Sequence, residues 1–347
     1  MMLERSPLWQ LTHARMMGFL REPEALFWVF AFPLLLALAL GIAFRNSGPQ
    51  KSNVGVVLGP GADSVLAALR ASPELSVKTY SASDADQALR RGKAAVMVRP
   101  DATGPATLSY DPARPETRLA HLEVVNALEA AAGRHDVVPL QLDTQPRAGS
   151  RYIDFLIPGL LGLNLLGTGM WGIGFPVANA RQLKLLKRMV ATPMKRGDYL
   201  LAMMLARMVW LALEVAAILV FGRYAFGVMM RGSWLGFVVV TLVGALAFSA
   251  LGLLVASRAR TIEAVSGLMN VAMMPMWLLS GSFFSADRFP QIMQPLVRAL
   301  PLTATNDALR ALMNEGASLT AVLPQLGVVA AWGLVSFFVA LQIFRWE

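Results

Sequence analysis

The sequence contains no cysteine, only three histidines and few charged residues. Without cysteine the chain has no disulfides and no thiolate metal site. His13, His121 and His135 lie too far apart along the chain to suggest a metal cluster. Charged residues make up 15% of the chain and apolar residues 56%, against about 25% and about 45–50% in soluble domains. These values exclude an ordinary soluble enzyme, a disordered chain and a small disulfide scaffold, and they favour a membrane protein.

Six segments carry little or no charge and are long enough to cross a bilayer, which takes about 20 apolar residues. They are residues 25–44, 155–180, 199–222, 232–257, 264–286 and 319–344. Uncharged runs of this length are rare in soluble proteins, so we predict an α-helical polytopic membrane protein with six transmembrane helices. The first segment could instead be a cleaved signal peptide. Its leader carries three glutamates (Glu4, Glu22 and Glu24) and its apolar run is long, so we favour a span.

Basic residues gather in the loop after the second segment and give the predicted orientation. Residues 181–196 hold six Lys or Arg: Arg181, Lys184, Lys187, Arg188, Lys195 and Arg196. Because cytoplasmic loops are enriched in Lys and Arg, we expect this loop and both termini to be cytoplasmic, in the plasma (inner) membrane. The net charge of +9 then reflects membrane topology, and we expect no nucleic-acid partner.

Residues 1–24 show the pattern of an amphipathic helix. One side carries Leu8, Leu11, Met16, Phe19 and Leu20, with Trp9 beside them, and the other carries Gln10, His13, Arg15 and Arg21. We predict an interfacial elbow helix that lies against lipid on the cytoplasmic side. The alternative is a disordered tail.

Residues 45–150 differ from the rest, with 12 basic and 11 acidic residues. Short apolar strand candidates (53–58, 75–80, 94–98 and 107–110) alternate with helix candidates (62–71, 83–91 and 116–134). This order predicts a small extracytoplasmic α/β domain. We expect Ser83 or Asp84 to cap the second helix. For the third helix we expect an apolar face of Leu119, Leu122, Val125 and Leu128. Catalytic or metal-binding spacings are absent from this insert, so we interpret it as a docking or gating module.

The basic loop, residues 181–198, begins with a second amphipathic pattern. Leu183, Leu186, Met189 and Val190 fall on one helical face, and Lys184, Lys187 and Arg188 take the rest. Thr192 and Pro193 end the helix, because proline disfavours an α conformation in the residue before it. Such a helix can lie on lipid or fit a groove on a partner protein, and the residues alone leave both open.

Two motifs resemble a known family. The run Leu186-Lys-Arg-Met-Val-Ala-Thr-Pro193, followed by Arg196, is similar to the permeases of type 2 ABC transporters. The second resemblance comprises Leu279-Ser-Gly-Ser-Phe-Phe284, Phe289-Pro290, Leu300-Pro-Leu-Thr303 and Asp307-Ala-Leu-Arg310. The layout of elbow helix, six spans and insert extends the resemblance to the whole chain. Many members carry acidic residues just before the loop helix. Here the run is Asn179-Ala-Arg-Gln182, so the family's ion pairs are not carried over.

The resemblance implies a permease subunit of an ATP-driven exporter that acts with a second permease copy and a separate cytoplasmic ATPase. The sequence contains no G-x-x-x-x-G-K-[ST] motif, so the chain would hold no cofactor, and ATP–Mg would bind the ATPase. The coupling residues would be Leu183, Leu186, Lys187, Arg188, Met189, Thr192 and Pro193. Membrane lipid is an expected partner and an extracytoplasmic accessory protein is left open. No residue selects among substrates.

Within the spans, three features stand out. The second span is rich in Gly, and with the fifth, interrupted by Pro275, it is our candidate dimer interface. Ordinary Gly and Pro usage in membrane helices is the alternative. Residues 287–313 are too polar to cross and predict a re-entrant segment at the outer face. Arg207 and Glu214 share a face of the third span about 10 Å apart. We therefore expect partners on neighbouring helices, for ion pairing or a substrate path.

Two other functions are weighed against the permease. An ion-driven secondary transporter needs acidic residues at mid-membrane in repeated positions, and Glu214 alone qualifies. An intramembrane enzyme or envelope-assembly protein would show H-E-x-x-H, G-x-S-x-G or a carboxylate pair in a span, and the sequence has none. Dependence of transport on a partner ATPase separates the three.

Overall fold

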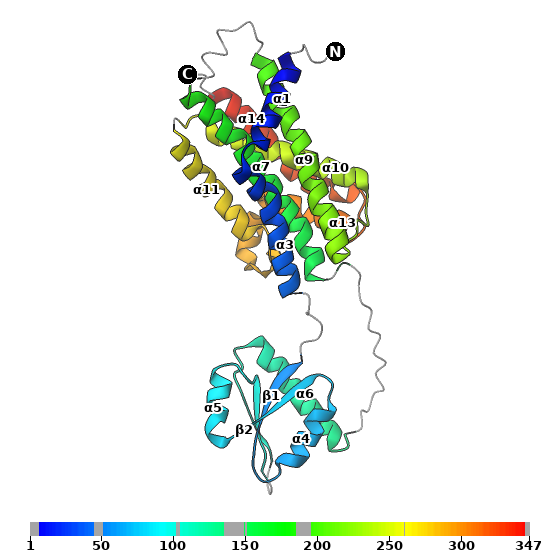
Figure 1. Cartoon of the computed structure of the whole chain (residues 1–347). Helices are drawn as coiled ribbons and strands as arrows, with labels where there is room; N and C mark the ends of the chain where they lie inside the picture. Colours follow the sequence, from blue (N-terminus) through cyan, green and yellow to red (C-terminus); the bar gives the residue numbers. More distant parts are fainter. Residues whose placement is uncertain are drawn as a thin grey trace. The chain divides into compact units, whose positions relative to one another are not determined.

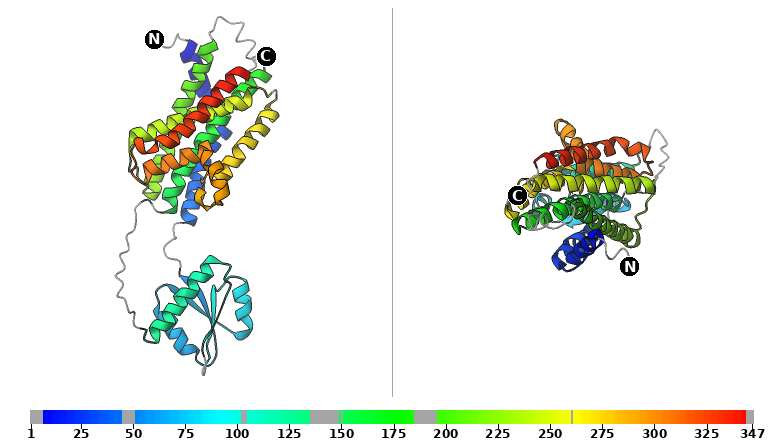
Figure 2. Two further views of the ribbon diagram at one scale, coloured as in Figure 1. Left: turned by 180° about the vertical axis from the view of Figure 1, so that it is seen from behind. Right: turned by 90° about the horizontal axis from the view of Figure 1, so that it is seen from above.

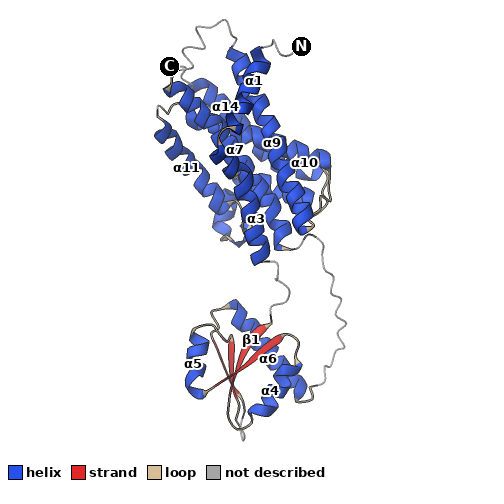
Figure 3. Cartoon of the chain, in the orientation of Figure 1, coloured by secondary structure: helices blue, strands red, loops and turns tan. Residues whose placement is uncertain are grey.

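The computed structural model describes residues 7–44, 51–101, 105–134, 149, 151–184, 196–259 and 261–343. The chain divides into two compact units, Met1–Arg45 with Pro146–Glu347, and Asn46–Gln145. The described part of the first unit is helical, and the second contains a β-sheet (Figures 1 and 3). We describe each unit by itself.

The first unit contains the long apolar helices. In chain order they are α1 (Pro7–Leu20), α2 (Pro23–Leu26), the π-helical turn η2 (Phe27–Ala31), α3 (Phe32–Ala43), α7 (Tyr152–Gln182), α9 (Arg196–Phe226), α10 (Trp234–Ala256), α11 (Ile262–Leu279), α12 (Gln294–Ala299), α13 (Pro301–Met313) and α14 (Leu323–Ile343). Six helical stretches in the described residues are long and apolar enough to cross a membrane. They correspond to the six predicted spans. The fifth ends at Leu279 rather than 286, where Ser280 and the positive-φ Gly281 stop the helix.

The two ends of this bundle hold different elements. α1, the last turn of α7, the first turns of α9 and α11 and the last turn of α14 lie at one end (Figures 1 and 2). We call it the α1 end. The opposite end, where α3 stops and α7 starts, we call the linker end. Each span reverses the chain direction, so successive spans finish at opposite ends of the bundle. Six spans therefore bring the last turn of α14 back to the end that holds α1.

α7 is the central helix, and most of it is buried among other helices of the same chain. A Cβ added at Gly252 of α10 would lie 2.6 Å from the carbonyl oxygen of Met170, and one at Gly169 would lie 2.7 Å from Cβ of Phe248. Gly159 and Gly162 are just as close to Ser282 and Asn306. These glycines therefore serve packing within one chain. Our expectation that the Gly-rich second span forms a dimer interface is wrong for them.

α1, which we predicted to be an interfacial elbow helix, packs along α9. Its buried side includes Thr12, and the Phe19 ring lies 4.5 Å from that of Trp210 on α9. Part of the face that we assigned to lipid thus contacts protein, because apolar side chains beside a span are buried against it. Trp9 and Leu20 are exposed.

The second unit is a four-stranded sheet of order β2-β1-β3-β4. β1 (Ser52–Val57) pairs in parallel with β2 (Leu75–Tyr80) and β3 (Val96–Arg99), and β4 (Thr107–Tyr110) is antiparallel to β3. α4 (Ala62–Ala71) and α6 (Pro115–Ala131) share an apolar core with one face of the sheet. α5 (Ala82–Arg90) packs on the other face.

Two details of this unit differ from the sequence predictions. Ser81, not Ser83 or Asp84, caps α5, and its Oγ accepts the backbone N–H of Asp84 at 3.2 Å. Leu119 and Leu122 of α6 are exposed, at 55% and 59%. Of the predicted face Leu128 packs against the core, and the rest of the buried face is formed by small residues, including Ala120 and Val124. They let the helix approach the sheet closely, and this contact sets the rotation of α6.

Candidate functional site

The predicted coupling loop lies largely outside the described residues. Leu186, Lys187, Arg188, Met189, Thr192 and Pro193 all fall in residues 185–195, of which nothing is described. Leu183 is described. It forms the C-cap of α7 and is exposed at 55%, which leaves it available for contacts beyond this chain's described residues.

Arg181, in the last turn of α7, binds the end of a neighbouring span. Its Nη1 donates to the carbonyl oxygens of Ala256 at 2.9 Å and Ala259 at 2.8 Å, and its Nη2 donates to Ser257 at 3.1 Å. The final carbonyls of a helix have no intrahelical N–H partner, and a cation stabilises that end. Arg181 therefore caps α10 from another helix. Sequence reasoning counted Arg181 as one of several loop cations and did not assign it this contact.

Arg207 and Glu214 form a direct ion pair inside α9. Arg207 Nη1 lies 2.8 Å from Glu214 Oε1, and the side chains are only 8% and 3% exposed. Our expectation that a direct pair would be too stretched is wrong. Two turns separate the Cα atoms along one face, and an extended arginine together with a glutamate bridges that rise.

Thr168 of α7 joins this pair to a second helix. Arg207 Nη2 donates to Thr168 Oγ1, which lies 3.1 Å from Glu214 Oε2 and 2.6 Å from the carbonyl oxygen of Asn164. A buried ion pair is stable when further hydrogen bonds satisfy its remaining polar atoms. Glu214 is thus held by α7 as well as by Arg207. Glu214 is the one carboxylate that could serve an ion-driven transporter, and it is paired with Arg207.

Asn164, one turn before Thr168, reaches the first span. Its Nδ2 donates to the carbonyl oxygen of Val29 at 3.0 Å. Val29 lies four residues before Pro33, which has no N–H to bond that oxygen. In a membrane such a freed carbonyl needs a partner from another helix. Asn164 supplies it.

The same arrangement recurs at the linker end. Pro158 frees the carbonyl oxygen of Asp154, and Asn314 Nδ2 donates to that oxygen at 2.8 Å. Arg310 of α13 lies with its guanidinium 3.7 Å from the ring centroid of Phe155 and also donates to the carbonyl of Gly281. Asn306 donates to Ser282 Oγ at 2.9 Å.

These contacts explain the second family-like motif. Ser280, Gly281 and Ser282 of its first part bind Arg310 of its last part and Asn306, the residue just before that part. α13 lies buried against α7, α10 and α14. The sequence could show that Pro158 leaves a carbonyl without a donor, but not that Asn314 supplies one.

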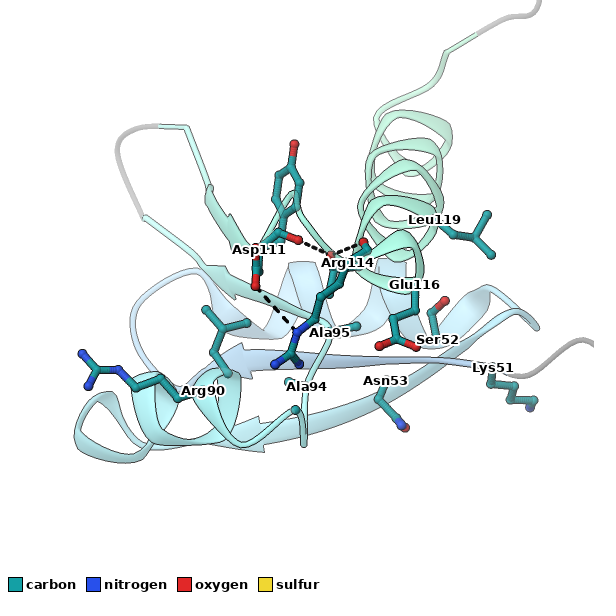
Figure 4. Close-up of a pocket in the computed structure, with 14 residues that line it drawn as sticks. Lys51, Ser52, Asn53, Arg90, Ala94, Ala95, Asp111, Arg114, Glu116 and Leu119 are labelled. Carbon is teal, nitrogen blue, oxygen red and sulfur yellow. Dashed lines mark hydrogen bonds and ion pairs between the residues drawn. The ribbon is translucent and has the colours of Figure 1, made fainter. Parts of the chain in front are cut away.

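The insert contains a cavity of about 590 Å³ between the end of α5 and the start of α6 (Figure 4). Its lining holds three basic and two acidic side chains, Lys51, Arg90, Arg114, Asp111 and Glu116. Arg114 lies 3.6 Å from Asp111. β1 and β3 begin beside this cavity. Ligands of parallel sheets bind at the carboxyl ends of the strands, so we assign this cavity no role. No group of three His, Asp or Glu that could hold a metal occurs in the described residues.

Comparison with known proteins identifies the class. A family model described as ABC-2 family transporter protein matches residues 23–341, and the chain belongs to this family of multi-pass membrane transport permeases. Nodulation protein J of Rhizobium meliloti (strain 1021) is 31% identical over 107 residues, 31% of this chain and 40% of that protein. Nodulation protein J of Neorhizobium galegae is 24% identical over 202 residues, 57% of this chain and 75% of that protein.

A third relative is the inner membrane transport permease YhhJ of Escherichia coli (strain K12). It is 27% identical over 119 residues, 34% of this chain and 32% of that protein. The chain thus matches only about a third to two fifths of YhhJ and the Rhizobium meliloti protein. Membership of the family and a multi-pass membrane location are established by these matches, while the activity of the whole assembly is a matter for proposal.

Proposed function

We propose that this chain is the permease subunit of an ATP-driven exporter that works with a separate cytoplasmic ABC ATPase. The observation that carries the proposal is the ABC-2 family match across residues 23–341. The six helices able to cross a membrane agree with it. The nucleotide site, with ATP–Mg, belongs to the ATPase, since the sequence has no phosphate-binding loop.

The proposed coupling element is the basic loop 181–198 together with α1. α1 and the described ends of this loop, where α7 stops and α9 starts, lie at the α1 end of the bundle (Figure 1). The positive-inside rule places this end in the cytoplasm. Closure of the ATPase would then displace the ends of α7 and α9 and open the pathway toward the outside. The insert would be extracytoplasmic, where an accessory protein could dock.

We propose that the functional unit contains two copies of the chain. Because Gly159, Gly162, Gly169 and Gly174 of α7 pack closely within one chain, α11 is the better candidate for the contact between copies. Its exposed apolar side chains are Leu268, Val271, Met274, Trp277 and Leu278. Lipid is the other occupant of such a face. Cross-linking single cysteines at Val271 in the Cys-free chain would yield a dimer if α11 lies at the interface.

The proposal predicts that charge in the coupling loop uncouples transport. Leu186→Asp with Met189→Asp should remove apolar contacts with the ATPase and place charge in the interface, at a cost of several kcal/mol. The permease should still insert, since no span is altered. We expect at least a tenfold loss of ATPase co-purification and the loss of ATP-dependent transport.

A matched control makes the same replacement elsewhere. Leu119→Asp with Leu122→Asp changes two exposed leucines of α6 and should leave co-purification at the native level. Native co-purification and transport by the loop variant would contradict the coupling role. Transport that persists after the partner ATPase gene is deleted would contradict the exporter itself.

A further inference from the structure

Arg181 ties the end of α7 to the turn between two other spans. Its three hydrogen bonds, of 2.8–3.1 Å, reach Ala256, Ser257 and Ala259. These residues end α10 and lead into α11, whose N-cap is Thr261. Arg181 also lies two residues before Leu183, where α7 stops and the loop toward α9 begins. One guanidinium thus links the α1-end termini of three spans, α7, α10 and α11.

Hydrogen bonds hold the described residues on each side of this turn. Ser257 Oγ donates to the carbonyl of Leu254 at 2.6 Å, and Thr261 Oγ1 accepts the backbone N–H of Ala264 at 3.2 Å. A cation bound to such a turn moves with the whole turn. Arginine is suited to this task because its planar fork serves several acceptors at once, whereas lysine presents a single ammonium.

We propose that Arg181 is a positioning residue that makes the end of α7 and the α10–α11 turn move together when the ATPase displaces the coupling loop. The inference rests on the proposed function. The other contacts between α7 and α10 in the described residues are mainly apolar and can slide, while directed hydrogen bonds oppose sliding.

The test measures co-movement directly and needs no substrate. Spin labels are attached at Gln182→Cys and Glu263→Cys, exposed positions at the end of α7 and the start of α11. The Cys-free chain gives no background labelling. Distances are measured in the lipid-reconstituted complex with its ATPase, without nucleotide and after trapping with ATP and vanadate. In the native background we expect the same distance distribution in both states.

Arg181→Ala should make the distance differ between the two states, and Arg181→Lys should give a smaller difference. Arg258→Ala is the matched control, since Arg258 is an exposed cation of the same turn, and it should behave like the native chain. A complex of Arg181→Ala that forms and traps nucleotide shows that this variant is folded.

Three results overturn the inference. The distance could differ between states in the native background, it could stay equal in Arg181→Ala, or Arg258→Ala could act like Arg181→Ala. Each of these results is obtained on a complex that forms and traps nucleotide, so none of them contradicts the proposed exporter function. Failure to form any complex with an ATPase would instead contradict the proposed function, and this inference with it.

Discussion

At the scale of single residues, the Arg207–Glu214 pair predicts a strongly coupled response to mutation. Glu214→Gln leaves the Arg207 charge buried without a counter-charge, which costs about 3–5 kcal/mol. Arg207→Met with Glu214→Leu removes both charges, and such replacements are often neutral or stabilising. We therefore expect the single variant to lose much more thermal stability in detergent than the double variant. An equal or larger loss in the double variant would show that the two side chains do more than neutralise each other, for example by contacting substrate.

A second residue-scale prediction concerns Gly252. Its replacement by alanine would place a Cβ 2.6 Å from the Met170 carbonyl oxygen, and backbone cannot rotate away. α7 and α10 would have to separate, and overpacking of this kind costs about 1–3 kcal/mol. Gly167→Ala on α7 is the control, because its Cβ would meet nothing within 4 Å of the described residues. Thermal unfolding followed by fluorescence would compare the two, and equal stability would contradict the close approach.

At the scale of elements, proline and asparagine act as pairs across helices. Asn314→Leu orphans the Asp154 carbonyl, at a cost of about 1–3 kcal/mol. Pro158→Ala restores a backbone N–H for the same carbonyl. The Asn314 replacement should therefore cost less in the Pro158→Ala background than in the native chain, and a double-mutant cycle of unfolding midpoints measures the difference. Simple additivity would mean that Asn314 acts through another contact.

The elements also show where sequence reasoning reached its limit. Strands 75–80 and 107–110 and helix 62–71 have the predicted boundaries, because local alternation and turn residues define them. The rotation of α6 was predicted wrongly, since it depends on which side chains fit the sheet. Leu119 and Leu122 look like core residues in the sequence, and the smaller Ala120 and Val124 occupy that place.

At the scale of the whole molecule, the orientation can be tested with cysteines added to the Cys-free chain. Ser64 is an exposed position of α4 in the insert, and Ser64→Cys should react with an impermeant thiol reagent in intact cells whose outer barrier is permeable to it. Ala191→Cys, in the basic loop, should react only after the cells are lysed. The positive-inside rule is the reason for this difference. Reaction at 191 but not at 64 would reverse the proposed topology.

The sequence by itself determined the number of spans, the position of the insert and the family, because hydrophobic length, basic loops and local motifs are properties of short segments. The tertiary structure decided how the polar and small residues are used. In the folded chain Arg207 pairs with Glu214, glycines of α7 pack against α10 and α13, and Arg181 donates hydrogen bonds to the end of α10. These contacts join residues from 7 to more than 100 positions apart, and spacing along one helix cannot reveal which neighbour will face it.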